Sequence, residues 1–354
     1  MNKMAQGEHL KPHELRVVVL GGYQSGKTSL INTVLSQEPG GGGRDARCLK
    51  REGDISGRRL TLIDTPGWWT GYLLTDTAEL VKQDLVLSVC LCAPGPHAFL
   101  LTVETDAPFT EKKRKVVEQH LNLFGEDIWR HTIVVVTRGD SLKGKSIEQH
   151  IESEGDALKW VIGRCENRYH VVDSHSKDPD QVTDLVNKLE AVYAANSGSY
   201  FQIDRETLKE VEEKNSAVKL RATSRQDRIT EQRQMLEQHG EVKPLTEMRI
   251  VLLGWVSSGK SSVRSTILDK EVLVTRSITV QSNIKSGKVE GRCVTVIDTP
   301  GWWKYFPAKN TPESVKTELK KSLTLGSKHP HAFLLVVPAD VSFLEDQRKS
   351  FKIT

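Results

Sequence analysis

The sequence predicts an α/β fold in which a mostly parallel sheet lies between two layers of helices, and it predicts this fold twice. A glycine-rich loop occurs as GGYQSGKT at residues 21–28 and again as GWVSSGKS at residues 254–261. Each copy follows an apolar run and leads into a helix-like segment, which is the strand–loop–helix context of the P-loop NTPase fold. Strand-like and helix-like segments then alternate, as in a doubly wound sheet.

Both loops contain the residue types that bind phosphate. Glycines let the backbone curl so that successive N–H groups point at phosphate oxygens, and the lysine adds positive charge near the outer phosphates. The next hydroxyl, from Thr28 or Ser261, is expected to hold a magnesium ion. The predicted nucleotide-contacting residues are Gly21, Gly22, Ser25, Gly26, Lys27, Thr28 and Ser29 in the first loop, and Gly254, Ser258, Gly259, Lys260, Ser261 and Ser262 in the second.

A second motif follows each loop, as LTLIDTPGWW in the first copy and VTVIDTPGWW in the second. In a nucleotide-dependent switch, Asp64 and Asp298 would hold the magnesium through water. Gly67 and Gly301 would each offer a backbone N–H to the terminal phosphate. The alternative for either copy alone is an ordinary Pro-Gly turn after a strand.

The HAFLL segment at residues 97–101 recurs at residues 331–335, and a period this long indicates duplicated domains. We expect a complete domain at residues 14–200, a charged helical linker at 201–245 and a second domain at 246–354. The second copy ends without counterparts of the last strands and helices of the first, so we expect it to be truncated, as in a fragment or an isoform. The expected strands of the first domain are residues 15–20, 59–63, 98–103, 132–137 and 169–172, and its expected helices are residues 28–35, 75–89, 110–124, 146–162 and 180–194.

Composition narrows the function classes. The 354 residues include 50 Lys and Arg against 46 Asp and Glu, a near balance that favours no nucleic-acid partner. Five cysteines without a CxxC pair indicate neither a disulfide framework nor a zinc site. The polar first residues do not form a signal peptide, and the longest apolar stretch is interrupted by Pro and Gly, so we expect no transmembrane helix. The linker is a solvated connector or, as the alternative, a surface for a partner helix or a membrane.

The strand expected at residues 132–137 runs into the tetrapeptide Thr137-Arg138-Gly139-Asp140. A carboxylate at this place can accept two N–H donors from guanine, a pattern that adenine does not supply. Asp140 is the predicted base-reading residue, with Thr137 and the stem of Arg138 beside the base. A solvated turn after the strand is the alternative.

These motifs together resemble the immunity-associated (IMAP) GTPase family, whose G domain is of the septin-like type. The resemblance rests on the loops, the IDTPGWW pair, the HAFLL box followed by FTE, the strand ending in TRGD, and the RYHVV segment. It implies binding of GTP or GDP with Mg2+, nucleotide-controlled self-association, and a cytoplasmic or organelle-surface location.

Two departures from the family pattern concern the switch loop and the base. Thr279 is suited to contact magnesium and the terminal phosphate, whereas the matching position of the first copy is Asp45. The asparagines that contact the base in the family correspond here to Asp173 and Ser174, so the resemblance places Asp173 among the base-contacting residues.

Other departures concern hydrolysis. Trp68 and Trp302 stand where small GTPases such as Ras carry a water-orienting glutamine, and Pro108 and Ser342 stand where the family often has an arginine. We expect the tryptophans to pack against the domain or at an interface. Intrinsic hydrolysis is therefore expected to be slow or absent.

Three functions stay open at this stage. The first is a guanine-nucleotide switch or scaffold, and the second is a GTP hydrolase in which Lys27, Thr28 and Asp64 organise phosphate and magnesium while a partner completes the site. The third is an ATP-using enzyme that shares only the loop. His97 and His331 precede apolar strands and are expected to be structural residues, not bases.

Overall fold

The computed structural model describes residues 12–38, 47–55, 57–176, 178–238, 245–269, 278–304, 310–325 and 329–350. Asp45, the position matched to Thr279, lies outside these residues. The chain divides into two compact units, residues 1–224 and 225–354.

The first unit contains a six-stranded sheet in the order β2-β3-β1-β4-β5-β6, in which only the β2–β3 pair is antiparallel. All five predicted strands are confirmed. The strands are β1 (Glu14–Gly21), β2 (Leu49–Ile55), β3 (Arg58–Asp64), β4 (Ala98–Glu104), β5 (Thr132–Thr137) and β6 (Tyr169–Val172). The sequence analysis missed β2, since this edge strand reads LKREGDI and is mostly exposed, with no apolar alternation to mark it.

Helices cover both faces of this sheet, so the predicted three-layer α/β/α fold is confirmed. Val18 and Leu20 of β1 share one core with α2, α3 and α5, whereas Val17 and Val19 share another with α1 and α6. The helices are α1 (Lys27–Val34), α2 (Glu79–Leu87), α3 (Glu111–Leu121), α4 (Ile147–Glu154), α5 (Asp156–Arg164) and α6 (Asp180–Ala195).

One predicted helix is two helices. The expected helix at residues 146–162 breaks at Gly155, whose φ of 90° is left-handed and ends α4 before α5 begins. Ser146 starts α4 with a capping box that includes Gln149. The expected start at Thr110 is confirmed, because its side chain accepts the backbone N–H of Lys113 at the N-cap of α3. The ends of α2 and α3 lie inside their predicted bounds and continue as 3₁₀ turns, Ser88–Cys92 and Asn122–Phe124.

An arginine–histidine contact is duplicated at the strand ends opposite the phosphate loops. The backbone N–H of Arg16 in β1 donates to Nδ1 of His97 at 3.1 Å, and that of Arg249 in β7 (Glu247–Leu253) donates to Nδ1 of His331 at 2.8 Å. The structural role predicted for both histidines is therefore confirmed. The two environments differ, since His97 is buried and His331 is exposed.

The second unit contains a four-stranded sheet in the order β10-β7-β9-β8, which repeats the order β4-β1-β3-β2 of the first. Its elements are β7, α8 (Lys260–Ile267), β8 (Asn283–Val289), β9 (Arg292–Asp298), α9 (Glu313–Ser322), β10 (Ala332–Leu335) and α10 (Glu345–Ser350). Among the described residues β10 pairs only with β7, and Phe333 and Leu335 on it are half exposed.

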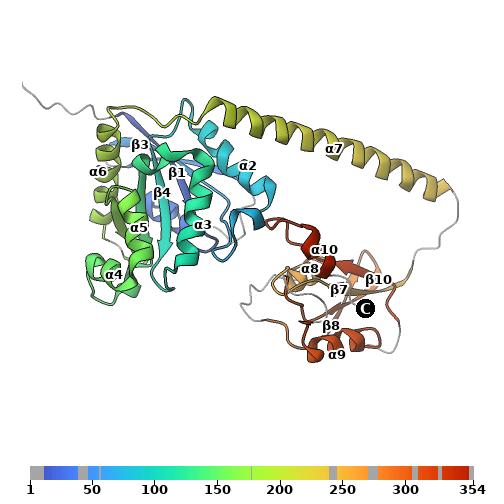
Figure 1. The fold of residues 1–354 in the computed structure, drawn as a ribbon. Helices are drawn as coiled ribbons and strands as arrows, with labels where there is room; N and C mark the ends of the chain where they lie inside the picture. Colours follow the sequence, from blue (N-terminus) through green and yellow to red (C-terminus); the bar gives the residue numbers. More distant parts are fainter. Residues whose placement is uncertain are drawn as a thin grey trace, which may run out of the picture. The chain divides into compact units, whose positions relative to one another are not determined.

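The linker forms α7 (Arg205–Gln238), a single unbroken helix of 34 residues without a buried side chain (Figure 1). Its apolar residues are spaced too irregularly for a coiled-coil seam. In the part of the chain that the structure describes, no helix has both the length and the apolar character needed to span a bilayer.

Buried neutral histidines predict a loss of stability in mild acid. Burial, with a smaller contribution from Arg16, lowers the pKa of His97 to about 4, and burial likewise lowers the pKa of His120 to about 4. Both titrate near 6.5 when unfolded, so the unfolded chain binds more protons between about pH 6.5 and 4. The free energy of unfolding should be level above that window and fall by about 1–2 kcal/mol per histidine by pH 5.

Urea unfolding of the full chain at pH 7 and pH 5, followed by tryptophan fluorescence, measures this difference. His97→Gln should reduce the difference, while His331→Gln, a change of the exposed counterpart, should leave it intact. Equal stability at the two pH values would contradict the prediction.

Candidate nucleotide-binding site

The first phosphate loop curls around the side chain of its own lysine. Gly26, at the N-cap of α1, has a φ of 89°, a left-handed conformation that favours glycine. Lys27 Nζ donates to the carbonyl oxygens of Gly21 at 3.3 Å and Gly22 at 2.9 Å. Thr28 and Ser29 on the first turn of α1 are exposed. The loop therefore has the cradle shape that phosphate binding requires.

Buried hydroxyl contacts fix this loop to the ends of two neighbouring strands. Ser25 Oγ lies 2.5 Å from Oγ1 of Thr102 in β4. The hydroxyl of Thr137, at the end of β5, donates to the carbonyl of Ser25 at 2.8 Å. Thr137, predicted to lie beside the base, thus also joins the phosphate loop to the TRGD segment.

Arg138 is the next residue of that segment and makes a second link to the loop. It has a left-handed φ of 59°, and its Nη2 donates to the carbonyl of Gln24 at 2.9 Å. Its Nη1 forms an ion pair with Asp106. These two contacts hold the guanidinium beside the phosphate loop.

The residues predicted to hold magnesium meet at the end of β3. Thr28 Oγ1 donates to Asp64 Oδ2 at 2.8 Å, and the Asp64 side chain is buried. Hydroxyl and carboxylate oxygens are the hard donors that Mg2+ prefers, so this pair fits the ion.

The DTPG segment approaches the loop closely enough to require its glycine. A Cβ at Gly67 would lie 2.7 Å from Lys27 Nζ and 2.9 Å from the backbone nitrogen of Tyr23. The hydroxyl of Thr65 donates to the carbonyl of Val19 at 2.7 Å, and the N–H of Tyr23 donates to the carbonyl of Trp68 at 2.5 Å. These bonds hold the loop and the segment together.

Trp68 is a core residue, as predicted for the tryptophans of this motif. Its side chain is 2% exposed and stacks on His120 with 4.6 Å between ring centroids. His120 Nε2 lies 2.9 Å from Oγ1 of Thr77, and its Nδ1 lies 2.7 Å from the carbonyl oxygen of Val116. Trp302 of the second copy is buried to the same extent.

Asp140 is exposed in the loop that follows β5, and the side chains of Asp173 and His175 lie close to it. The Nδ1 atom of His175 lies 3.9 Å from Asp140 Oδ2 and 3.7 Å from Asp173 Oδ1. The parallel register of β5 and β6 pairs Thr137 with Val172, which brings the two loops that follow these strands together. The sequence analysis identified Asp140 and Asp173 but missed His175, because its position depends on this register and not on a motif.

The second loop repeats the backbone geometry of the first. Lys260 Nζ donates to the carbonyl oxygens of Gly254 at 3.1 Å and Trp255 at 2.9 Å, and Gly259 has a φ of 93°. Burial lowers the pKa of Lys260 to about 8, and the charge of Asp298 partly opposes this. Ser258 is buried, while Ser262 on α8 is exposed.

The DTPG segment of the second copy is also tied to its loop. The hydroxyl of Thr299 donates to the carbonyl of Leu252 at 2.7 Å, and the N–H of Val256 donates to the carbonyl of Trp302 at 2.8 Å. A Cβ at Gly301 would lie 2.4 Å from the nitrogen of Val256.

The residues predicted to hold magnesium in the second copy also come together. Ser261 Oγ donates to Asp298 Oδ2 at 2.6 Å, and Thr279 Oγ1 lies 3.5 Å from Ser261 Oγ. Arg264 reaches the same carboxylate oxygen, with Nη1 at 3.1 Å. The sequence analysis missed Arg264, since its place in the motif is not a phosphate-binding position.

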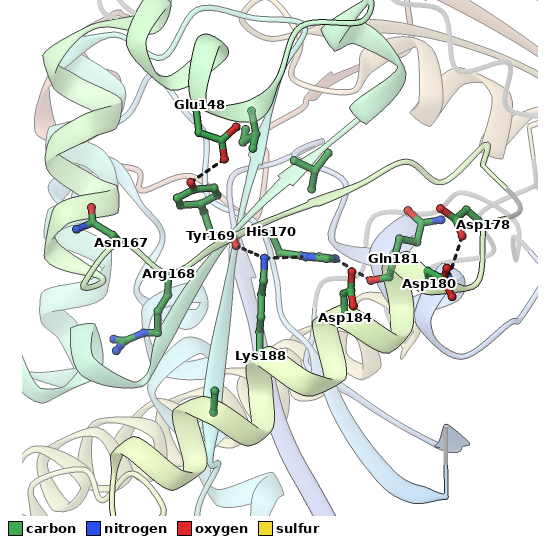
Figure 2. Close-up of a pocket in the computed structure, with 13 residues that line it drawn as sticks. Glu148, Asn167, Arg168, Tyr169, His170, Asp178, Asp180, Gln181, Asp184 and Lys188 are labelled. Carbon is green, nitrogen blue, oxygen red and sulfur yellow. Dashed lines mark hydrogen bonds between the residues drawn. The ribbon is translucent and has the colours of Figure 1, made fainter.

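A separate hollow of about 640 Å³ lies along the edge strand β6 and the helix α6. None of the predicted site residues lines it. Figure 2 shows two of its polar side chains bonded to the strand: Glu148 accepts from the hydroxyl of Tyr169 at 2.9 Å, and Lys188 donates to the carbonyl of Tyr169 at 2.8 Å. None of the residues that line this hollow belongs to the phosphate loop, and we assign the nucleotide site to the loop.

Comparison with known proteins identifies relatives of this chain. It is 26% identical over 341 residues to the human protein GTPase IMAP family member 8, and the match covers 92% of this chain and 49% of that protein. It is 24% identical over 248 residues to immune-associated nucleotide-binding protein 13 of Arabidopsis thaliana, covering 65% of this chain and 73% of that protein. The chain thus spans about half the length of the IMAP family member 8 proteins that it matches.

Among solved structures, Toc33 from Arabidopsis thaliana in complex with GDP and Mg2+ is similar at a TM-score of 0.42 and 20% identity, over 55% of this chain and 89% of that chain. The sequence profile of the AIG1 family matches residues 15–222 and 248–354, which is most of the chain. The resemblance seen in the sequence is thereby confirmed, and the chain belongs to the AIG1 family, the family of the IMAP GTPases.

Proposed function

We propose that the first unit binds GTP and GDP with Mg2+ and serves as a nucleotide-regulated switch or scaffold with slow or partner-dependent hydrolysis. The observation that carries the proposal is the hydrogen bond from the Thr137 hydroxyl to the Ser25 carbonyl. This bond joins the phosphate loop to the segment that ends in Asp140. The groups that we propose to bind phosphate and to read the base therefore lie on one continuous edge of the sheet, as a single nucleotide requires. The relatives named as GTPases and nucleotide-binding proteins support it.

Each group of the first loop has a separate task. Lys27, held in the loop by two backbone carbonyls, places its charge where the outer phosphates would lie. Thr28 and Asp64 would hold the magnesium ion, which neutralises charge on those phosphates when bound. Gly67 lies against the loop, where a Cβ on it would be 2.7 Å from Lys27 Nζ, and it would offer its backbone N–H to the terminal phosphate.

The choice of guanine over adenine rests on the exposed carboxylate of Asp140. A carboxylate can accept hydrogen bonds from the N1 and N2 donors of guanine, while adenine would leave it unmatched. The side chains of Asp173 and His175 lie beside this carboxylate.

Slow hydrolysis follows from the position of Trp68. Its ring is buried against His120, so it cannot orient water as a glutamine does in other GTPases. A group supplied by another molecule would complete the site, and self-association through the surface around the nucleotide is the arrangement we propose.

Asp140→Ala should abolish most of the preference for guanine. Removing the acceptor should weaken GDP binding by about 1–3 kcal/mol, or roughly 5- to 150-fold, and leave ADP binding nearly unchanged. Competition binding with fluorescent GDP and ADP analogues measures this in full-length chain carrying Lys260→Ala, which removes the second loop from the signal. Asp127→Ala, at an exposed carboxylate outside the site, is the matched control. Equal affinity for the two nucleotides before Asp140 is changed would reject the proposal.

Phosphate release from GTP should depend on protein concentration. We expect a rate below about 10⁻² s⁻¹ per dilute chain, because Pro108 stands where the family often has an arginine, and a higher rate per chain as chains associate. A concentration series with Lys260→Ala measures it, and Lys27→Ala/Lys260→Ala gives the background. A rate at that background for all concentrations would instead indicate a scaffold that does not hydrolyse GTP.

A further inference from the structure

Arg264 lies in α8, one turn after Ser261, and its guanidinium enters the metal end of the second loop. Its Nη1 donates to Asp298 Oδ2 at 3.1 Å, and the same oxygen accepts the Ser261 hydroxyl at 2.6 Å. The side chains of Arg264 and Asp298 are 15% and 1% exposed, so the ion pair is largely shielded from water. The carboxylate that should hold magnesium already has a cationic partner.

The other carboxylate oxygen of Asp298 does not take part in this contact. Asp298 Oδ1 is buried and has no hydrogen-bond partner among the described residues. The Asp64 side chain of the first unit is buried to the same extent, so burial does not distinguish the two carboxylates. What distinguishes Asp298 is that its Oδ2 is shared between the loop hydroxyl and a guanidinium.

The guanidinium of Arg264 cannot admit a metal ion to Asp298 by losing its own proton. It carries only donors and stays charged in proteins, so it cannot ligate a cation and it repels a divalent ion a few ångströms away. It can, however, place positive charge and N–H donors near phosphate oxygens, which is part of what the metal supplies in a P-loop site. The residues of the second loop therefore do not fit Mg2+, but they fit a phosphate group.

The first unit has no such residue at the matching position. Arg264 lies four residues after Lys260, and the residue four after Lys27 is Ile31. Ile31 is fully buried in the core that α1 forms with β1. The two loops thus share their backbone geometry and differ in the chemistry of one helix position beside the metal.

We propose that Arg264 takes the place of Mg2+ in the second unit, so that its phosphate loop binds a nucleoside diphosphate without a divalent metal. Lys260 and the backbone of the loop bind the phosphates, Asp298 orients the guanidinium, and Ser261 completes the hydrogen bonds of that carboxylate. The proposal goes beyond the function of the first unit and does not depend on it.

The test counts nucleotide and metal in the same sample of full-length chain. Lys27→Ala isolates the second loop and Lys260→Ala isolates the first. Each variant is loaded with GDP and Mn2+, freed of excess ligand, and analysed by chromatography for GDP and by electron paramagnetic resonance for bound Mn2+. We expect Lys27→Ala to retain about one GDP and almost no Mn2+, and Lys260→Ala to retain about one of each. Adding Arg264→Ile to Lys27→Ala gives position 264 the same residue type as Ile31, the matching position of the first unit. This double variant should bind about one Mn2+ per chain.

Metal removal provides a measurement that leaves Arg264 intact. Treatment with EDTA should leave the GDP affinity of Lys27→Ala within about twofold, and should weaken that of Lys260→Ala by about tenfold or more. Arg292→Ala, at an exposed arginine on the first residue of β9, is the matched control and should change neither count. Arg264→Gln gives a second substitution if Arg264→Ile does not fold, as judged by circular dichroism.

Three results would overturn the proposal: stoichiometric Mn2+ in Lys27→Ala, no GDP in Lys27→Ala, or unchanged metal-free binding in a folded Arg264 variant. Failure of the proposed function of the first unit would show separately, as loss of GDP or Mn2+ from Lys260→Ala.

Discussion

The close contact between the phosphate loop and the DTPG segment is the constraint on which both sites depend. In the first unit no side chain fits at Gly67, because Lys27 Nζ and the backbone of Tyr23 occupy the space. At Gly301 in the second unit the backbone of Trp255 and Val256 occupies the space. Each DTPG segment begins with the aspartate that ends its strand, Asp64 or Asp298. The contact between the segment and the loop therefore brings this carboxylate close to the loop lysine and to the N-terminus of the helix that follows the loop. Phosphate chemistry at either site requires these groups together.

Duplication preserved this backbone arrangement while the side chains around it diverged. The threonine of the DTPG segment binds the same strand carbonyl in both copies, and the loop lysine binds two loop carbonyls in both. At the metal end, Ile31 packs into the core of one copy whereas Arg264 pairs with the carboxylate of the other. A conserved fold of the loop therefore does not imply the same ligand chemistry.

The sequence predicted those parts of the fold and site that local backbone rules determine. Glycines with left-handed φ at Gly26 and Gly259, apolar strands and the TRGD turn are visible from a few neighbouring residues. The strand β2 escaped prediction because its partner, not its own pattern, makes it a strand. His175 and Arg264 escaped prediction because their roles come from contacts with residues distant in sequence, namely Asp140 and Asp298. Tertiary proximity of this kind has no signature in a single sequence.

Packing of Trp68 bears on how the first unit could respond to its nucleotide. The carbonyl of Trp68 accepts from the phosphate loop, and its ring stacks on His120 of α3. His120 is in turn held by contacts with Thr77 and with the backbone of its own helix. The segment behind DTPG is therefore fixed on both sides, to the loop and to the core, and turning the indole toward the phosphates would break the stack. Under the proposed function, a water-orienting group would therefore come from a second molecule and not from this position.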